Sequence, residues 1–221
     1  MSSENEERDP FQMMRLILEL RQTGITDTFL LNAIESLPRH EFIPEELGEF
    51  AYDDVALPIA CGQTITRPST VAGMVYALEL GEMRAYTVLE IGTGSGFLTA
   101  LTSKLARRVY TVDRYRTLIE SARQRFEALR ITNIVSQCSD GALGWSATAP
   151  FDRIVSTCAV ETIPKVWLDQ LKPDGIMVIP VGTNEDQFVK KIIKKADGSL
   201  QEESLAPSKF LHLADGVAKE L

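Results

Sequence analysis

Several residue types and patterns are scarce in this sequence of 221 residues. It has three cysteines, Cys61, Cys138 and Cys158, which form no C-x-x-C pair, and only two histidines. This scarcity argues against a metal site and favours reduced thiols in a cytoplasmic protein. No apolar run approaches the length of a membrane span, and the N-terminus is polar and acidic where a signal peptide would be basic and then apolar. We therefore expect a cytoplasmic protein with no metal and no membrane partner.

Basic residues are also outnumbered, with 23 Lys and Arg against 31 Asp and Glu, which gives a formal net charge of −8. Binding to a nucleic-acid backbone needs clustered Lys and Arg, so we expect no nucleic-acid partner. The length suits one domain with a substantial core, and the sequence has no internal repeat, low-complexity stretch or linker that would divide it. We predict a single domain over residues 1–221.

The most informative stretch is an apolar run, Val88 to Ile91, that passes into a turn containing Gly92, Gly94 and Gly96. The run suits a buried parallel strand, and the glycines allow tight turning and close approach by a ligand. Apolar residues recur at helical spacing from Phe97 to Arg107, so the turn delivers backbone N–H groups to a helix N-terminus. The pattern predicts a nucleotide pocket, although a plain strand-to-helix turn and a dehydrogenase loop would look similar.

The next predicted strand, Val109 to Val112, ends in Asp113, where a carboxylate can accept both hydroxyls of an adenosyl ribose. A dinucleotide-binding fold would show the same acid. The glycine spacing separates the two cases, because the chain has E-x-G-x-G-x-G, beginning at Glu90, in place of the dehydrogenase G-x-G-x-x-G. This pattern resembles the nucleotide loop of S-adenosylmethionine-dependent methyltransferases.

Strand and helix patterns alternate along most of the chain, whereas Met1 to Pro10 lack periodicity and predict a frayed terminus. Alternation implies a doubly wound sheet whose ligand lies at the carboxyl ends of the strands. Helices are expected from Met13 to Leu20, Asp27 to Leu37, Thr70 to Leu80, Phe97 to Arg107, Leu118 to Leu129 and Ile163 to Leu171, and strands from Val88 to Ile91, Val109 to Val112, Asn133 to Val135, Phe151 to Ser156 and Ile176 to Val181.

The C-terminal part predicts an antiparallel hairpin. Apolar and basic residues alternate from Phe188 to Lys195, Asp197-Gly198 forms a turn, and a polar passage leads to Phe210 through Leu213. Before this hairpin, Pro173-Asp174-Gly175 predicts another turn.

Four further motifs carry a more specific resemblance: Leu57-Pro58-Ile59, Gly62-Gln63-Thr64-Ile65-Thr66-x-Pro68, VLEIGTGSGF, and Gly144-Trp145 through Pro150-Phe151-Asp152. Together, and in this order, they resemble the protein-L-isoaspartate O-methyltransferases from about Met14 to Gly182. The resemblance implies a doubly wound, mostly parallel Rossmann-like sheet with an N-terminal helical extension and a C-terminal antiparallel hairpin. Residues 1–80 would form the helical, substrate-side extension, and residues 81–221 the cofactor-binding sheet and hairpin.

The same resemblance implies S-adenosyl-L-methionine as cofactor and methylation of the α-carboxyl of L-isoaspartyl residues in damaged proteins, which starts repair to aspartate through a succinimide. The expected partners are isoaspartyl-containing peptides and proteins, and we expect a monomer. The acid and glycine at Asp140-Gly141 would sit against the adenine edge, although Asp-Gly is also a common turn pair. The candidate cofactor-binding residues are Glu90, Gly92, Thr93, Gly94, Ser95, Gly96, Asp113, Asp140 and Gly141.

Thr66 is the candidate catalytic residue, because it stands where the family has a serine thought to hold the substrate carboxyl group. Ile65, Arg67, Val160, Glu161 and His212 are further candidates on the substrate side. The chain departs from the family's usual Ala-Pro at Val160-Glu161 and from its proline at His212, and an inward-pointing Glu161 would repel a carboxylate. Two alternatives therefore stay open: a methyltransferase with another carboxyl or small-molecule acceptor, and an inactive cofactor-binding homologue.

Overall fold

A seven-stranded sheet forms the centre of the computed structural model, which describes residues 10–218; the prediction for Met1 to Pro10 lies outside the described residues except at Pro10. The strand order is β5-β4-β3-β6-β7-β8-β9, parallel from β5 to β7 and antiparallel from β7 to β9. The strands are β3 (Thr87–Ile91), β4 (Arg108–Asp113), β5 (Ile134–Cys138), β6 (Phe151–Ser156), β7 (Leu171–Gly182), β8 (Gln187–Lys194) and β9 (Leu200–Pro207). The predicted doubly wound, mostly parallel sheet with a C-terminal antiparallel hairpin is confirmed.

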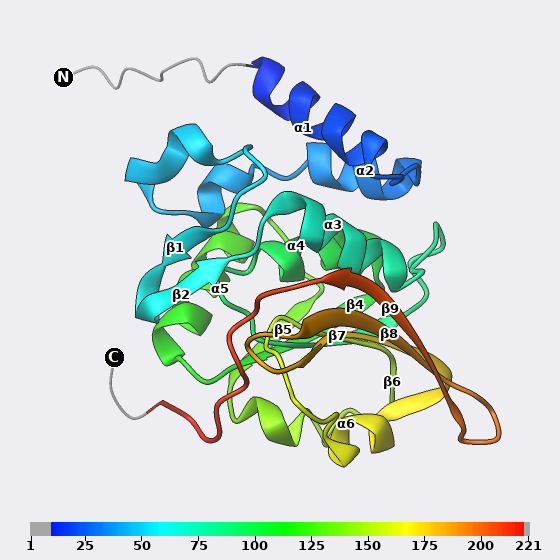
Figure 1. Cartoon of the computed structure of the whole chain (residues 1–221). Helices are drawn as coiled ribbons and strands as arrows, with labels where there is room; N and C mark the ends of the chain where they lie inside the picture. The colour runs from blue at the N-terminus through cyan, green and yellow to red at the C-terminus, as the bar shows by residue number, and fades with distance from the viewer. Residues whose placement is uncertain (1–9, 219–221) are drawn as a thin grey trace.

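Helices cover both faces of this sheet (Figure 1). Neighbouring residues of β3 pack on opposite faces of the sheet. Val88 belongs to the core that contains Leu98 and Ala122, and Leu89 belongs to the core that contains Trp167. A strand buried on both faces has no polar side to alternate with. The helices are α1 (Pro10–Gln22), α2 (Thr28–Glu35), α3 (Pro68–Ala77), α4 (Phe97–Leu105), α5 (Arg116–Ala128) and α6 (Lys165–Asp169).

An N-terminal layer, residues 10–77, lies over α4 and is coloured blue to cyan-green in Figure 1. Asp27 caps α2 by accepting the N–H groups of Phe29 and Leu30, as predicted. The stretch after α2, where no helix or strand is expected from the sequence, contains several short elements. They are the short helices η1 (Arg39–Phe42), η2 (Glu45–Phe50) and η3 (Ala60–Gly62) and the antiparallel strands β1 (Leu57–Ile59) and β2 (Gln63–Ile65). Strands of three residues are too short to show periodicity.

Two predicted elements near the C-terminus differ from the structure. The helix expected from Ile163 to Leu171 is shorter, because Leu171 already pairs with Phe151 in the sheet. The turn predicted at Pro173-Asp174-Gly175 is an irregularity inside β7, where the register with β6 shifts. In the hairpin, the polar passage is itself the second strand, β9, and Phe210–Leu213 lies beyond it.

Among residues 10–218, no helix is long and apolar enough to cross a membrane.

Candidate active site

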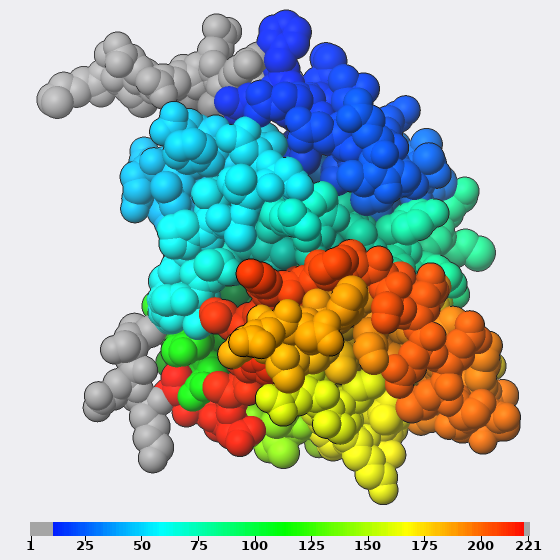
Figure 2. Space-filling view, in the orientation of Figure 1, coloured from blue at the N-terminus to red at the C-terminus, as the bar shows by residue number. Residues whose placement is uncertain are grey.

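A cavity of about 690 Å³ opens at the carboxyl ends of the parallel strands. This volume suits a small organic ligand. Its walls come from the N-terminal layer, from the loops after β3, β4 and β6, and from the C-terminal segment beyond β9. In the space-filling view the cyan N-terminal layer and the orange-red C-terminal residues face each other across the front of the molecule (Figure 2). The site therefore joins parts of the chain that are far apart in sequence.

The glycine loop forms the floor of the cavity. The N–H groups of Gly92 and Thr93 donate to the Val112 carbonyl, at 2.8 and 3.2 Å, and fix the loop against β4. Gly92 has φ +92°, and a Cβ atom there would collide with the Thr157 hydroxyl and lie 2.9 Å from Cys158 Sγ. The Thr157 hydroxyl also donates to the Gly92 carbonyl, at 2.7 Å. Only glycine lets the backbone pass here without displacing the loop after β6.

Asp113 lies at the end of β4 and lines the cavity. Its Oδ2 accepts the Gly94 N–H and its Oδ1 accepts the Tyr115 N–H, both at 2.9 Å. Burial raises the pKa of this carboxyl, while its hydrogen bonds to Tyr115 and Gly94 lower it. The side chain is therefore held rigidly by the loop it supports, and each oxygen keeps a lone pair for a hydroxyl donor in the cavity.

Glu90 lies beneath the loop and does not line the cavity. Its side chain is fully buried, and its Oε2 accepts a short hydrogen bond from the Thr99 hydroxyl. The other oxygen, Oε1, has no hydrogen-bond partner among the described residues. Burial raises the pKa of Glu90 to about 8, so a proton can be retained at neutral pH. Glu90 thus joins β3 to α4 through Thr99 and does not face the cavity.

Thr66 lies on the opposite wall, at the end of β2 and just before α3. Its carbonyl accepts a hydrogen bond from Arg39 Nη2, at 3.1 Å. The neighbouring Arg67 is exposed, and its Nε donates to the Thr70 hydroxyl at 2.8 Å. Ile65 is buried and pairs with Leu57 across the two-stranded sheet. The three predicted residues Ile65, Thr66 and Arg67 all line the cavity.

The C-terminal segment closes the third side. Leu211 and Leu213 pair with Ala159, because the Ala159 N–H donates to the Leu211 carbonyl at 2.9 Å and the Leu213 N–H donates to the Ala159 carbonyl at 2.8 Å. His212 lies between these two residues and lines the cavity. Further along, the Gly216 N–H donates to Asp140 Oδ2 at 3.0 Å. Residues 211–216 are thereby fastened over the carboxyl ends of β5 and β6.

Not all predicted residues gather at the cavity. Gly92, Thr93, Gly94, Ser95, Asp113, Gly141, Ile65, Thr66, Arg67 and His212 line it, whereas Glu90, Gly96, Asp140, Val160 and Glu161 do not. Asp140 accepts backbone N–H groups with both oxygens, from Ala142 at 2.9 Å and from Gly216. Glu161 is exposed and does not line the cavity.

The sequence analysis missed several lining residues, including Thr157, Cys158, Arg114 and Lys209. Thr157 and Cys158 directly follow β6, so the rule that drew attention to Asp113, a residue at the carboxyl end of a parallel strand, would have found them. Burial raises the pKa of Cys158 to about 12, which keeps it a neutral thiol. Arg67, Arg114 and Lys209 make the walls cationic, and within residues 10–218 Asp113 is the one acid that lines them.

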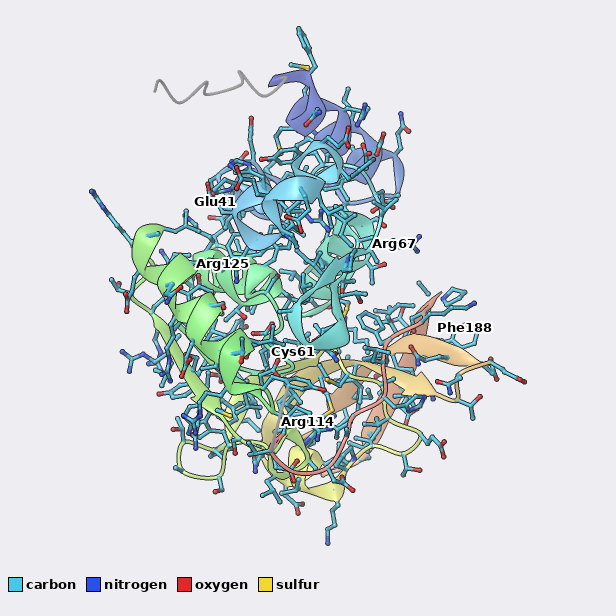
Figure 3. The ribbon with its side chains drawn as sticks, turned by 90° about the vertical axis from the view of Figure 1, so that its left-hand side faces the viewer. Glu41, Cys61, Arg67, Arg114, Arg125 and Phe188 are labelled. Atoms are coloured by element: carbon cyan, nitrogen blue, oxygen red, sulfur yellow. The ribbon has the colours of Figure 1, made fainter. Side chains whose placement is uncertain are left out.

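Arg125 on α5 ties the glycine loop to the N-terminal layer. Its Nε donates to the Glu41 carbonyl at 2.7 Å, and its Nη1 donates to the Ser95 carbonyl at 3.3 Å. Figure 3 shows Arg125 and Glu41 next to each other, with Cys61 at the tip of the β1–β2 hairpin above Arg114. Hydrogen bonds from Arg125 therefore join the glycine loop to the N-terminal layer on the opposite side of the cavity.

The chain is similar to proteins of known family along almost its whole length. The family described as Protein-L-isoaspartate(D-aspartate) O-methyltransferase (PCMT) matches residues 12–218. A protein-L-isoaspartate O-methyltransferase of Maricaulis maris is 47% identical over 213 residues, which cover 96% of this chain and 98% of the relative. One from Xanthobacter autotrophicus is 46% identical over 222 residues and covers all of both chains.

Solved structures of the same class are also similar to this chain. A protein-L-isoaspartate O-methyltransferase superposes with a TM-score of 0.81 at 27% identity, over 93% of this chain and 67% of that one. A Plasmodium falciparum protein assigned to the same class, in complex with S-adenosyl-L-homocysteine, has a TM-score of 0.78 at 21% identity, over 90% of this chain and 97% of that one. At 21% identity, the second similarity supports the fold alone.

Proposed function

This chain belongs to the protein-L-isoaspartate O-methyltransferase family, and we propose that it transfers a methyl group from S-adenosylmethionine to the α-carboxylate of L-isoaspartyl residues in peptides and proteins. One observation carries the proposal: a single cavity joins the glycine loop and Asp113 on one wall to Thr66 on the other. The substrate-side extension, predicted over residues 1–80, would hold the acceptor.

The residues of the cofactor wall fit an adenosyl sulfonium ligand. The bare backbone at Gly92 leaves room for close approach, and Asp113 offers two carboxylate oxygens to ribose hydroxyls. Such a ligand carries no phosphate, so no basic clamp is needed at the loop. S-adenosylmethionine supplies a methyl group on a positively charged sulfur.

The acceptor wall has to position an anion. A carboxylate with an ordinary pKa near 4 is already ionised at neutral pH, so no general base is required. The Thr66 hydroxyl can donate a hydrogen bond to one carboxylate oxygen and orient the other, and Arg67 and Lys209 add positive charge along the walls. Orientation in a site closed to water contributes on the order of 7–11 kcal/mol in well-aligned reactions. Positioning is thus the main chemical task of this chain.

The ester product accounts for a role in repair. Esterification converts a poor leaving group into methoxide, so the following backbone amide nitrogen can close a succinimide ring. Hydrolysis of that ring yields normal aspartate together with isoaspartate. The enzyme therefore only has to make the ester and release it.

The proposal is tested with radiolabelled S-adenosylmethionine and three reactions: an isoaspartyl peptide, the same peptide with normal aspartate, and buffer alone. We expect base-labile methyl ester only with the isoaspartyl peptide. Equal labelling of both peptides would indicate a less specific carboxyl methyltransferase. No labelling, with the cofactor still bound, would contradict the proposal and favour a binding protein.

Thr66 should distinguish two substitutions. Thr66→Ser keeps the hydroxyl and is expected to retain turnover, whereas Thr66→Ala should lower kcat/KM for the isoaspartyl peptide by about 10-fold or more, the value of one hydrogen bond to a charged group. Affinity for S-adenosylhomocysteine should be the same in both variants. Wild-type turnover in Thr66→Ala would show that Thr66 has no role in the reaction and is only a residue at the start of α3.

Asp113→Ala is expected to weaken S-adenosylhomocysteine binding by about 1–3 kcal/mol, because the ribose hydroxyls lose their acceptor and the Gly94 N–H loses its partner. Titration calorimetry measures this loss. Asp197→Ala, in the exposed β8–β9 turn, is the control for removing one carboxylate. Unchanged affinity in Asp113→Ala would remove Asp113 from the cofactor site.

A further inference from the structure

Arg39 is a buried cation outside the cavity. Its side chain is 1% exposed and donates to three backbone carbonyls: Nη1 to Ala51 at 2.6 Å, and Nη2 to Thr66 at 3.1 Å and to Val55 at 3.4 Å. Burial lowers the pKa of Arg39 to about 10, so the guanidinium stays charged at neutral pH. Burying a charge is costly unless it is well bonded, and one of the three carbonyls that accept from this guanidinium belongs to Thr66.

Asp54 holds the same segment from its other end. Its Oδ1 accepts the Ser69 N–H and its Oδ2 accepts the Ser69 hydroxyl, both at 2.7 Å. The negative charge of Asp54 also favours the charged form of Arg39. Residues 66–69 are therefore held at both ends, the Thr66 carbonyl by a cation and the Ser69 amide by an anion. Local backbone preferences alone would not fix such a stretch.

The same guanidinium touches the cofactor side. It lies over the ring of Phe97, 5.6 Å from the ring centroid. Phe97 is the first residue of α4, directly after the glycine loop, and it lines the cavity. Arg39 thus contacts the segment that carries Thr66 and the helix that begins at the cofactor loop.

We propose that Arg39 and Asp54 are positioning residues that set the distance and orientation of Thr66 relative to the cofactor loop. The inference rests on the proposed function of this site and adds residues that touch neither ligand. A misplacement of about 1 Å can lower a rate by about 100-fold. Loss of either residue should therefore affect the acceptor reaction more than cofactor binding.

The test uses Arg39→Met, which keeps most of the side-chain volume over Phe97 and removes the donors. We expect kcat/KM for the isoaspartyl peptide to fall by about 10- to 100-fold, with S-adenosylhomocysteine affinity changed by less than about threefold. Amide hydrogen exchange at residues 66, 67, 69 and 70 should accelerate in the same variant, in the absence of ligand. Arg39→Lys keeps the charge but not the three-carbonyl geometry, so it should rescue turnover only in part.

Arg15→Met is the matched control, because Arg15 is exposed and pairs with Asp53 on the surface of the same layer, at 2.6 Å. It should leave turnover and exchange at wild-type values. Asp54→Ala supplies the second test if Arg39→Met does not fold, and should also lower kcat/KM about 10-fold or more while cofactor affinity persists.

Two results would overturn the inference: wild-type kcat/KM in a folded Arg39→Met or Asp54→Ala protein, or an equal loss of cofactor affinity and turnover in both. Failure of the proposed function gives a different result: the wild-type protein itself would not methylate the isoaspartyl peptide.

Discussion

Replacing Gly92 with alanine is expected to abolish detectable binding of S-adenosylhomocysteine and, with it, methyl transfer. Gly92 has φ +92°, a region that disfavours any residue with a Cβ, and the added methyl would collide with the Thr157 hydroxyl and crowd Cys158 Sγ at 2.9 Å. Both neighbours line the cavity, so relief of the collision must move a wall of the site. Titration calorimetry and the methylation assay measure the two losses.

Gly24 provides a control with nearly the same backbone conformation. It has φ +93°, and a Cβ there would meet no atom within 4 Å. Gly24→Ala should therefore cost about 1 kcal/mol of stability from backbone strain and leave cofactor affinity unchanged. If Gly92→Ala behaves like Gly24→Ala, the cavity floor tolerates a methyl group and the close approach argued for Gly92 is wrong.

Local chemistry accounts for the parts of the molecule that the sequence predicts well. β3 is apolar on both faces because both are covered, and its glycines must follow where the chain turns sharply into α4. Parallel strands bring their carboxyl ends to one edge, so Gly92 and Asp113 had to lie near each other. The structure adds the hydrogen bond between Gly94 and Asp113 that joins them.

The C-terminal part was harder to predict because its structure depends on distant partners. β9 is an edge strand whose residues are all exposed, so it has no apolar face and no period of two. Leu211 and Leu213 are apolar and suggest a strand end, but they pair with Ala159, about fifty residues earlier in the chain. No local pattern specifies such a contact.

Two acidic residues near the site show a further property that the sequence does not predict, the direction of a side chain. Asp140 and Glu161 both follow predicted strands, yet the first fastens Gly216 and the second is exposed. Sequence position could place each at the correct edge of the sheet but could not give the direction of the side chain. Arg39 lies in a stretch where the sequence predicts no helix or strand, and no local pattern indicates the bonds it makes to Ala51 and Thr66.

Glu90 should make the stability of the protein depend on pH. Its carboxyl has a pKa near 8 in the folded chain, raised by burial, against about 4.3 when unfolded. Because the folded pKa is the higher one, the stabilising contribution is complete below about pH 4 and is lost as the pH rises toward 8. The difference between the two limits is on the order of 5 kcal/mol. A wild-type protein at pH 9 carries this cost in full.

Glu90→Gln removes the titrating group and keeps an oxygen that can accept from the Thr99 hydroxyl. We expect the free energy of unfolding of Glu90→Gln, relative to that of the wild type, to increase as the pH rises from 5 to 9. Urea unfolding at several pH values measures this difference. Glu203→Gln, an exposed glutamate on β9, controls for the loss of one negative charge. If the difference between Glu90→Gln and the wild type is the same at pH 5 and pH 9, Glu90 is ionised throughout this range.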